Sequence, residues 1–194
     1  MKRTIPLLLS AVAVVAMSAS AAFAADSGNH LLPGDHGRSL DGILPTSPPP
    51  LGQMPRNAAH APAIALAVEA AEAIAEGCKQ YPLGIAVVDA AGAPILVYLP
   101  DGSEPRHGYT AIRKAYTAVA MKSSTTSLVV KAQQDPEFAA QIKADPNLMA
   151  FHGGLLLKVG DQVIGAIGVS GAEPGGHDDE CGLIGLNKIQ SRLK

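Results

Sequence analysis

The side chains best suited to chemistry gather in one short segment, "RHGYTAIRKAYTA", at residues 106–118. Within a few helical turns this segment holds one imidazole, two phenols and two adjacent cations, at His107, Tyr109, Arg113, Lys114 and Tyr116. An imidazole or a phenolate can ligate haem iron, and an arginine or a lysine can pair with the propionate carboxylates. An ordinary amphipathic helix with a solvated basic face has the same composition, so the residue types alone leave both interpretations open.

An acidic stretch, "GGHDDECG" at residues 175–182, is the second segment with ligand-type side chains. It directly precedes an apolar-periodic segment, which predicts a helix start with Asp178 as the N-cap. Asp179 and Glu180 then lie in the first turn, where acids favour the helix dipole. Because consecutive side chains fan around a helix axis, only His177 with Glu180 or Cys181 could share a metal ion.

The glycine-rich run "GAIGVSG" at residues 165–171 does not fit a phosphate-binding loop. It lacks the lysine of a Walker motif, and Ile167 and Val169 continue a strand through the glycines. Glycines inside a strand more often mark the close approach of a helix or a ligand. The sequence also has no nucleophile elbow, no His-Glu-x-x-His pair and no Cys-x-x-Cys motif, so hydrolase, zinc-protease and thiol-redox functions lack support.

The chain begins with basic, apolar and small residues in the order typical of a secretory signal peptide. Lys2 and Arg3 precede the apolar run, and small residues end at Ala24, which predicts residues 1–24 as the signal peptide. The apolar run is shorter than the roughly 20 residues of a membrane span, so an uncleaved anchor is the weaker alternative. We expect a mature protein that is periplasmic or extracellular and has no membrane span.

Residues 25–61 are rich in Pro, Gly, Ser and Asn and show no helical or strand period. Such a composition buries too little apolar surface to offset chain entropy, so we expect a disordered leader. Its three histidines, His30, His36 and His60, are expected in solvent.

Charge and composition narrow the class of protein further. Without the two basic residues of the signal peptide, 13 basic and 17 acidic residues remain, a formal charge of about −4. That balance, with no basic cluster, argues against a nucleic-acid partner. The chain has no tryptophan and few aromatic residues, which implies close packing of helices on a sheet through small side chains.

The order of periodic segments predicts an α+β fold. A helix is expected in residues 61–80 and two strands in residues 83–101 around the turn "DAAGAP". A second hairpin in residues 153–171 turns at Gly160, and a last helix runs over residues 178–193. Hairpins give an antiparallel sheet, and the helices at the two ends must cover one of its faces.

Between the hairpins, residues 103–124 predict the second helix. One face of this helix is apolar, with Ile112, Ala115, Tyr116 and Val119. The opposite face carries the cations Arg113 and Lys114. Gly108 is unfavourable inside a helix, so we expect the helix to begin at Tyr109. Two shorter helical pieces follow, with Asp135 and Asp145 each predicted as an N-cap before a proline.

Three segments carry a family resemblance: "GIAVVDAAGAPILVYLPDG", "RKAYTAVAMKSSTTSL" and "GGLLLKVGDQVIGAIGVSGAEPGGHDDECGLIGL". In order and spacing they resemble the HbpS/GlcG family of haem-binding proteins, which is related to the C-terminal domain of the PduO-type adenosyltransferase. The likeness covers roughly residues 62–189, within a predicted domain of residues 62–194. It implies a profilin-like antiparallel sheet flanked by helices, with the N- and C-terminal helices on one face.

The resemblance also implies haem as the cofactor and a homo-oligomeric, ring-like assembly. Secreted members that this chain resembles use a threonine just after the "RKA-aromatic-TA" helix as a haem contact, which corresponds to Thr125, with Thr126 as the register alternative. Where PduO-like members use a histidine, His107 is the nearest candidate for the iron ligand. The family pattern favours proline at the position of Leu156 and does not predict a histidine at position 152. His152 is therefore either a second ligand or a surface residue.

The implied fold bears on the only two cysteines, Cys78 and Cys181. If the first and last helices run antiparallel side by side, the end of one meets the start of the other. Outside the cytoplasm such a pair can form a disulfide. Closing a loop of about 100 residues would stabilise the fold by roughly 4–5 kcal/mol in the chain-entropy model.

The sequence therefore predicts an exported haem-binding protein that sequesters, delivers or senses haem. One alternative is a small-molecule catabolic enzyme with Asp89 or Glu104 as a general base beside Arg113. Another is a ligand-free accessory protein that docks on a sensor or transporter. No turnover reaction is assigned, although bound haem could support peroxidase-like or haem-degrading side activity.

Overall fold

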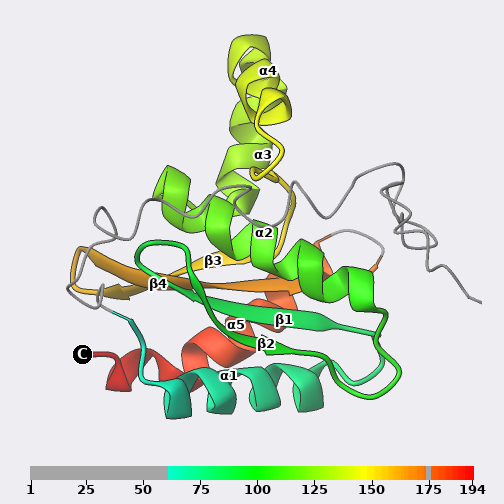
Figure 1. Cartoon of the computed structure of the whole chain (residues 1–194), viewed down its shortest axis with the longest axis vertical. Coiled ribbons are helices and arrows are strands. Elements are labelled where there is room, and N and C mark those ends of the chain that lie inside the picture. The colour runs from blue at the N-terminus through cyan, green and yellow to red at the C-terminus, as the bar shows by residue number, and fades with distance from the viewer. Residues whose placement is uncertain (1–60, 174–175) are drawn as a thin grey trace, which may run out of the picture.

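The computed structural model describes residues 61–173 and 176–194 (Figure 1). The expected signal peptide, the leader up to residue 60, and with it His30, His36 and His60, lie outside these residues. The expectations about them stay predictions.

The described residues contain one antiparallel sheet of four strands in the order β2-β1-β4-β3. The strands are β1 (Gly84–Asp89), β2 (Pro94–Tyr98), β3 (Gly154–Val159) and β4 (Gln162–Ser170). Two hairpins, β1–β2 and β3–β4, form as predicted, and β1 and β4 join them in the centre of the sheet. Gly160, with a φ of +57°, lies in the β3–β4 turn at the predicted place.

Helices cover both faces of this sheet (Figure 1). On one face α1 (Ile64–Gly77) and α5 (His177–Ile189) lie side by side, and the short 3-10 helix η2 (Gln190–Arg192) follows α5. On the other face α2 (Pro105–Met121) crosses β1 and β4. The predicted α+β fold, with the first and last helices on one face, is confirmed.

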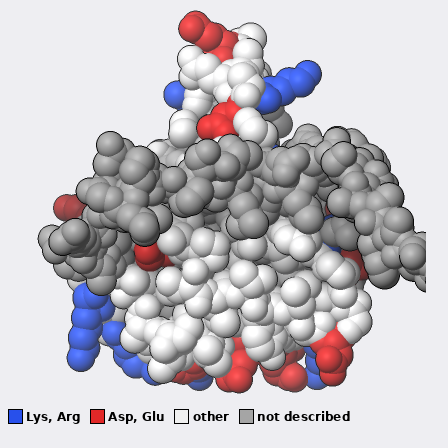
Figure 2. Space-filling model, in the orientation of Figure 1, with Lys and Arg blue, Asp and Glu red and all other residues white. Residues whose placement is uncertain are grey.

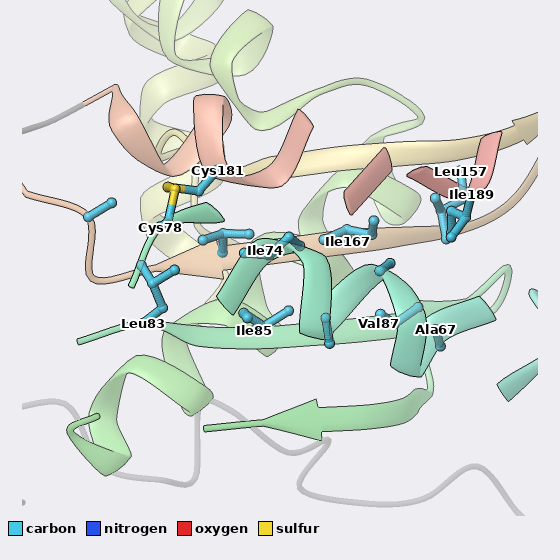
Figure 3. Packing of buried hydrophobic residues seen from close by; sticks show 14 of the residues in the cluster. Ala67, Ile74, Cys78, Leu83, Ile85, Val87, Leu157, Ile167, Cys181 and Ile189 are labelled. Atoms are coloured by element: carbon cyan, nitrogen blue, oxygen red, sulfur yellow. A yellow bond between two sulfur atoms is a disulfide. The ribbon is translucent and has the colours of Figure 1, made fainter. Parts of the chain in front are cut away.

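The larger apolar cluster fills the space between α1, α5 and the sheet (Figure 3). Its members are mostly alanine and branched aliphatic residues, among them Ala67, Ala70, Ile74, Ile85, Val87, Ile167 and Ile189. The helices approach closely because glycine stands where they touch: a Cβ on Gly185 would lie 2.6 Å from Ile74 Cδ1. Few aromatic side chains are needed for such a thin layer.

A disulfide joins Cys78 to Cys181, with a Cα–Cα distance of 5.9 Å and a sequence separation of 103 residues (Figure 3). It connects the end of α1 to the first turn of α5, because the two helices run antiparallel. Both cysteines are buried. The predicted pairing is confirmed.

Glycines of the sheet let the backbone of α2 lie directly on it. A Cβ at Gly168 of β4 would overlap the carbonyl oxygen of Ala111, and a Cβ at Gly84 of β1 would overlap the backbone of His107. The glycines of "GAIGVSG" therefore mark the close approach of a helix, one of the two interpretations that the sequence favoured.

The start of α2 differs from the expectation. The helix begins at Pro105, which takes the first helical position, and it includes Gly108. A Cβ at Gly108 would lie 3.3 Å from Leu99 Cδ1, so the glycine accommodates the neighbouring chain. Tertiary packing has outweighed the poor helix propensity of glycine, which is only about 1 kcal/mol.

Two helices, α3 (Thr125–Gln134) and α4 (Pro136–Ala144), project away from the sandwich (Figure 1). Asp135 caps α4 as predicted, since its carboxylate accepts a hydrogen bond from Phe138 N. The same prediction for Asp145 is wrong, because Asp145 ends α4 and its carboxylate accepts from Asn147 N in a turn. From there the chain returns to the sheet, where β3 begins at Gly154.

Among the helices of residues 61–173 and 176–194, none has the length and hydropathy needed to cross a membrane.

Candidate functional site

A buried ion pair links α2 on one face of the sheet to α5 on the other. Lys114 Nζ lies 2.7 Å from Asp178 Oδ2 and donates a second hydrogen bond to Val169 O at 2.9 Å. Asp178 Oδ1 accepts from Ala172 N at 2.9 Å. The lysine side chain thus reaches the first turn of α5 at the end of β4.

This arrangement corrects the N-cap prediction for Asp178. The N-cap position of α5 is Gly176, with a φ of +104°, and Asp178 already lies inside the first turn. Its carboxylate points toward the buried ammonium of Lys114 and the amide of Ala172. A cation from a distant helix competes for the carboxylate, and local capping patterns cannot reveal it.

The interpretation of α2 as an amphipathic helix with a solvated basic face, one of the two left open by the sequence, is also wrong. Only 7% of Arg113 and 3% of Lys114 are exposed. Arg113 Nη2 donates to Leu148 O, and the Thr117 hydroxyl accepts from Met149 N, so α2 holds the loop before β3. Burial lowers the pKa of Lys114 below the ordinary lysine value, and the Asp178 carboxylate opposes part of that shift.

The next residue of α5, Asp179, contacts three other groups. Its Oδ1 accepts from Gly153 N at 2.7 Å, and its Oδ2 lies 3.2 Å from His152 Nδ1. The hydroxyl of Thr126 donates to the same Oδ2 and lies 3.0 Å from His152 Nδ1. We call Thr126, His152 and Asp179 the His152 cluster.

The carboxylate determines which nitrogen of His152 carries the proton in the neutral ring. An ionised carboxylate accepts hydrogen bonds only, so Nδ1 is the protonated nitrogen and Nε2 keeps a lone pair. The side chain of His152 is 38% exposed. Its neighbour Phe151 is 60% exposed, a large fraction for an aromatic residue.

Thr125 and Thr126 face different surroundings. Thr125 is fully buried, and its hydroxyl accepts from Gly154 N at 2.8 Å at the start of β3. Thr126 is half-buried within the His152 cluster. Of the two threonines offered by the resemblance, Thr126 is therefore the more accessible one.

His107 lies in the first turn of α2, near the same end of the sheet. Its Nδ1 lies 2.5 Å from Pro82 O, which makes Nδ1 the donor. Only 8% of the residue is exposed. The ring packs beside Gly171, where a Cβ would lie 2.7 Å from Nδ1 and 3.1 Å from Cε1.

The two tyrosines are half-buried on α2. The ring of Tyr116 lies against Gly92 in the β1–β2 turn, where a Cβ would be 2.6 Å from its Cδ2. That turn is at the opposite end of β1 from the start of α2. The structure thus brings Lys114, Thr125, Thr126 and His152 together around the first turn of α5 and leaves Tyr116 apart from them.

A small apolar surface lies beside α2 on β2 and the chain just after it. Val97 and Leu99 are exposed and lie within 3.5 Å of the Cβ position of Gly108. In the face shown by Figure 2, few charged side chains lie over this part of the sheet. Neighbouring positions on a helix do not face the same way, so this surface is not on the side of α2 that His107 takes.

Asp89 and Glu104, the two candidates for the general base of a catabolic enzyme, have other contacts. Asp89 Oδ1 accepts from Ala91 N at 2.8 Å and from Ala93 N at 2.9 Å, which caps the β1–β2 turn. Glu104 is exposed and pairs with Arg106 at 2.6 Å. These contacts give both carboxylates a structural role and lend a general base no support.

Sequence reasoning missed the His152 cluster. Its members come from three separate segments, and His152 stood out only because the family pattern did not predict it. Across the described residues no group of three or more His, Cys, Asp or Glu side chains could hold a metal ion. His177 and Glu180, named as a potential ion-sharing pair, bond directly to each other at 2.8 Å.

Comparison with known proteins places the chain among haem-related proteins. A family model described as "Haem degrading protein HbpS-like" matches residues 58–187. The crystal structure of HbpS is 26% identical, with a TM-score of 0.61 over 73% of this chain and 97% of that chain. A double mutant of Streptomyces reticuli HbpS is 25% identical, with a TM-score of 0.61 over 78% of this chain and 97% of that one.

A third similar structure is a complex of PduOC with haem. It is 25% identical, with a TM-score of 0.57 over 65% of this chain and 91% of that chain. None of the curated proteins matches the chain.

Proposed function

The chain belongs to the HbpS-like family, and on that premise we propose that it binds haem. A similar solved structure, PduOC, is a complex with haem, which supports the same ligand here. The observation in this chain that carries the proposal is an imidazole held at Nδ1, for which there are two alternative candidates, His107 held by Pro82 O and His152 held by Asp179.

The residues present fit a haem group. Each histidine has a partner at Nδ1, so its neutral ring offers Nε2 as the lone-pair nitrogen that iron binds. Phe151, the exposed aromatic residue next to His152, can cover part of a porphyrin face. When bound, haem supplies the redox and oxygen chemistry, while the chain binds and orients it.

The other candidate contacts support the proposal unequally. Thr126, Tyr109 and Tyr116 are half-buried and keep some open surface for a ligand. Thr125, Arg113 and Lys114 are buried and engaged, so contact with haem requires each to leave its present partners. Pairing of Arg113 and Lys114 with the haem propionates stays a prediction, and it requires both side chains to leave these partners.

Titration of the mature chain, residues 25–194, with hemin tests haem binding. We expect a Soret band that shifts and saturates at a fixed ratio of hemin to chain. The half-buried His177 offers a matched control, because His177→Ala removes an imidazole that is not a candidate ligand and should leave the titration unchanged. A wild-type spectrum that equals free hemin at every ratio would contradict the proposal.

We also propose that the protein is exported by cleavage after residue 24 and that it sequesters, delivers or senses haem in the periplasm or outside the cell. The proposal extends to a homo-oligomer and to a sensor or transporter protein as partner. Intact mass of the protein from the periplasmic fraction should correspond to a chain that begins at Ala25. A full-length chain in the membrane fraction would contradict export, and a monomeric mass by light scattering would contradict the assembly.

A further inference from the structure

We propose that the residue that ligates haem iron in this chain is His152, through Nε2, and that Asp179 is its positioning residue. This inference rests on the proposed function and names the ligand that carries it. It also separates His152 from His107, the candidate that the family resemblance favoured.

Asp179 is held in place from several directions. Its two oxygens accept from the backbone amide of Gly153 and from the Thr126 hydroxyl, and Oδ2 faces His152 Nδ1 at 3.2 Å. The neighbouring Asp178 is tied to Lys114, which fixes the first turn of α5. A carboxylate so fixed orients the imidazole plane and raises the basicity of the ligating nitrogen, as in many metal sites.

The accessibility of the two histidines differs. An iron ligand must expose Nε2, and the flat porphyrin must also clear the backbone around the ring. The side chain of His152 is 38% exposed. His107 is 8% exposed and its ring packs against Gly171, so little of this ring is open to a porphyrin.

The same contacts indicate a metalloporphyrin and not a free metal ion. A free transition metal requires three or four protein ligands, and the described residues offer no such group around His152. Haem brings four nitrogens of its own, so one oriented imidazole completes the attachment to the protein. Phe151, the residue next to His152 and 60% exposed, supplies an aromatic surface for the macrocycle.

Hemin titration of a matched set of variants of the mature chain tests the inference. His152→Ala should weaken hemin binding by at least about tenfold and remove the spectral signature of an imidazole ligand, while His107→Ala keeps both. Asp179→Asn keeps the shape of the carboxylate but removes its charge, and it should weaken binding by about 10–100-fold. Circular dichroism of each variant checks that it remains folded.

Chemical rescue separates ligation from a structural role. In His152→Gly, added imidazole should restore the wild-type Soret position and the wild-type electron paramagnetic resonance spectrum. A merely structural histidine would not be rescued. Wild-type spectra in His152→Ala, or loss of the signature only in His107→Ala, would overturn the inference and leave haem binding intact. A wild-type chain that binds no hemin would overturn both.

Discussion

Replacing Asp178 with alanine should destabilise the fold strongly, because it leaves the buried ammonium of Lys114 without its carboxylate partner. Its Oδ2 lies 2.7 Å from Lys114 Nζ, and only 4% of the lysine side chain and 12% of the aspartate side chain are exposed. Water therefore does little to compensate the ammonium that remains. Removal of one partner from a buried pair costs about 3–5 kcal/mol, and loss of the bond to Ala172 N acts in the same direction.

Urea denaturation of a chain of residues 25–194, with the disulfide intact, measures this cost. The double variant Lys114→Met with Asp178→Leu should recover most of the loss, because apolar residues of similar size often replace a buried pair without a net penalty. The exposed pair of Lys79 and Glu76, at 2.9 Å, is the control, and Glu76→Ala should change the free energy of unfolding little. If Asp178→Ala were as mild as Glu76→Ala, the argument from burial would be refuted.

Three further predictions concern pH, the disulfide and the packing of α2. Between the lowered pKa of Lys114 and the ordinary lysine value of about 10.4, the native state binds fewer protons than the unfolded chain, so wild-type stability should rise with pH relative to Lys114→Met. Denaturation of both proteins from pH 8 to 10 checks this, and a falling difference would contradict it. Replacing Cys78 and Cys181 with serine opens a loop with a separation of 103 residues and should cost about 4–5 kcal/mol, whereas a loss below about 1 kcal/mol in urea would show that the cross-link is not needed. Gly168→Ala forces a Cβ into the carbonyl oxygen of Ala111 and should cost about 1–3 kcal/mol, and an unchanged melting temperature would disprove the tight contact.

Much of the fold follows from local patterns in the sequence. The turn at Gly160 and the short connection after Asp89 identified both hairpins, and hairpins allow only antiparallel pairing. The disulfide became predictable once the first and last helices were assigned to one face. These inferences succeed because they depend on neighbours in the sequence or on the resemblance to a known fold.

The candidate site was less predictable, because its contacts join distant segments. A helical period places Lys114 on a polar face, and only the fold reveals that Asp178, 64 residues away, pairs with it in the interior. Capping rules assigned Asp178 to the N-cap of α5 for the same reason. The partners of His152, Thr126 and Asp179, are 26 and 27 residues away, and no local pattern connects them.

The most direct test of haem binding at His152 is the absorption titration of the wild-type chain of residues 25–194 and its His152→Ala variant with hemin. We expect a saturable Soret shift for the wild type and a weaker transition without imidazole ligation for the variant. A wild-type chain with the spectrum of free hemin would contradict haem binding itself. Identical transitions in the two proteins would contradict the role of His152.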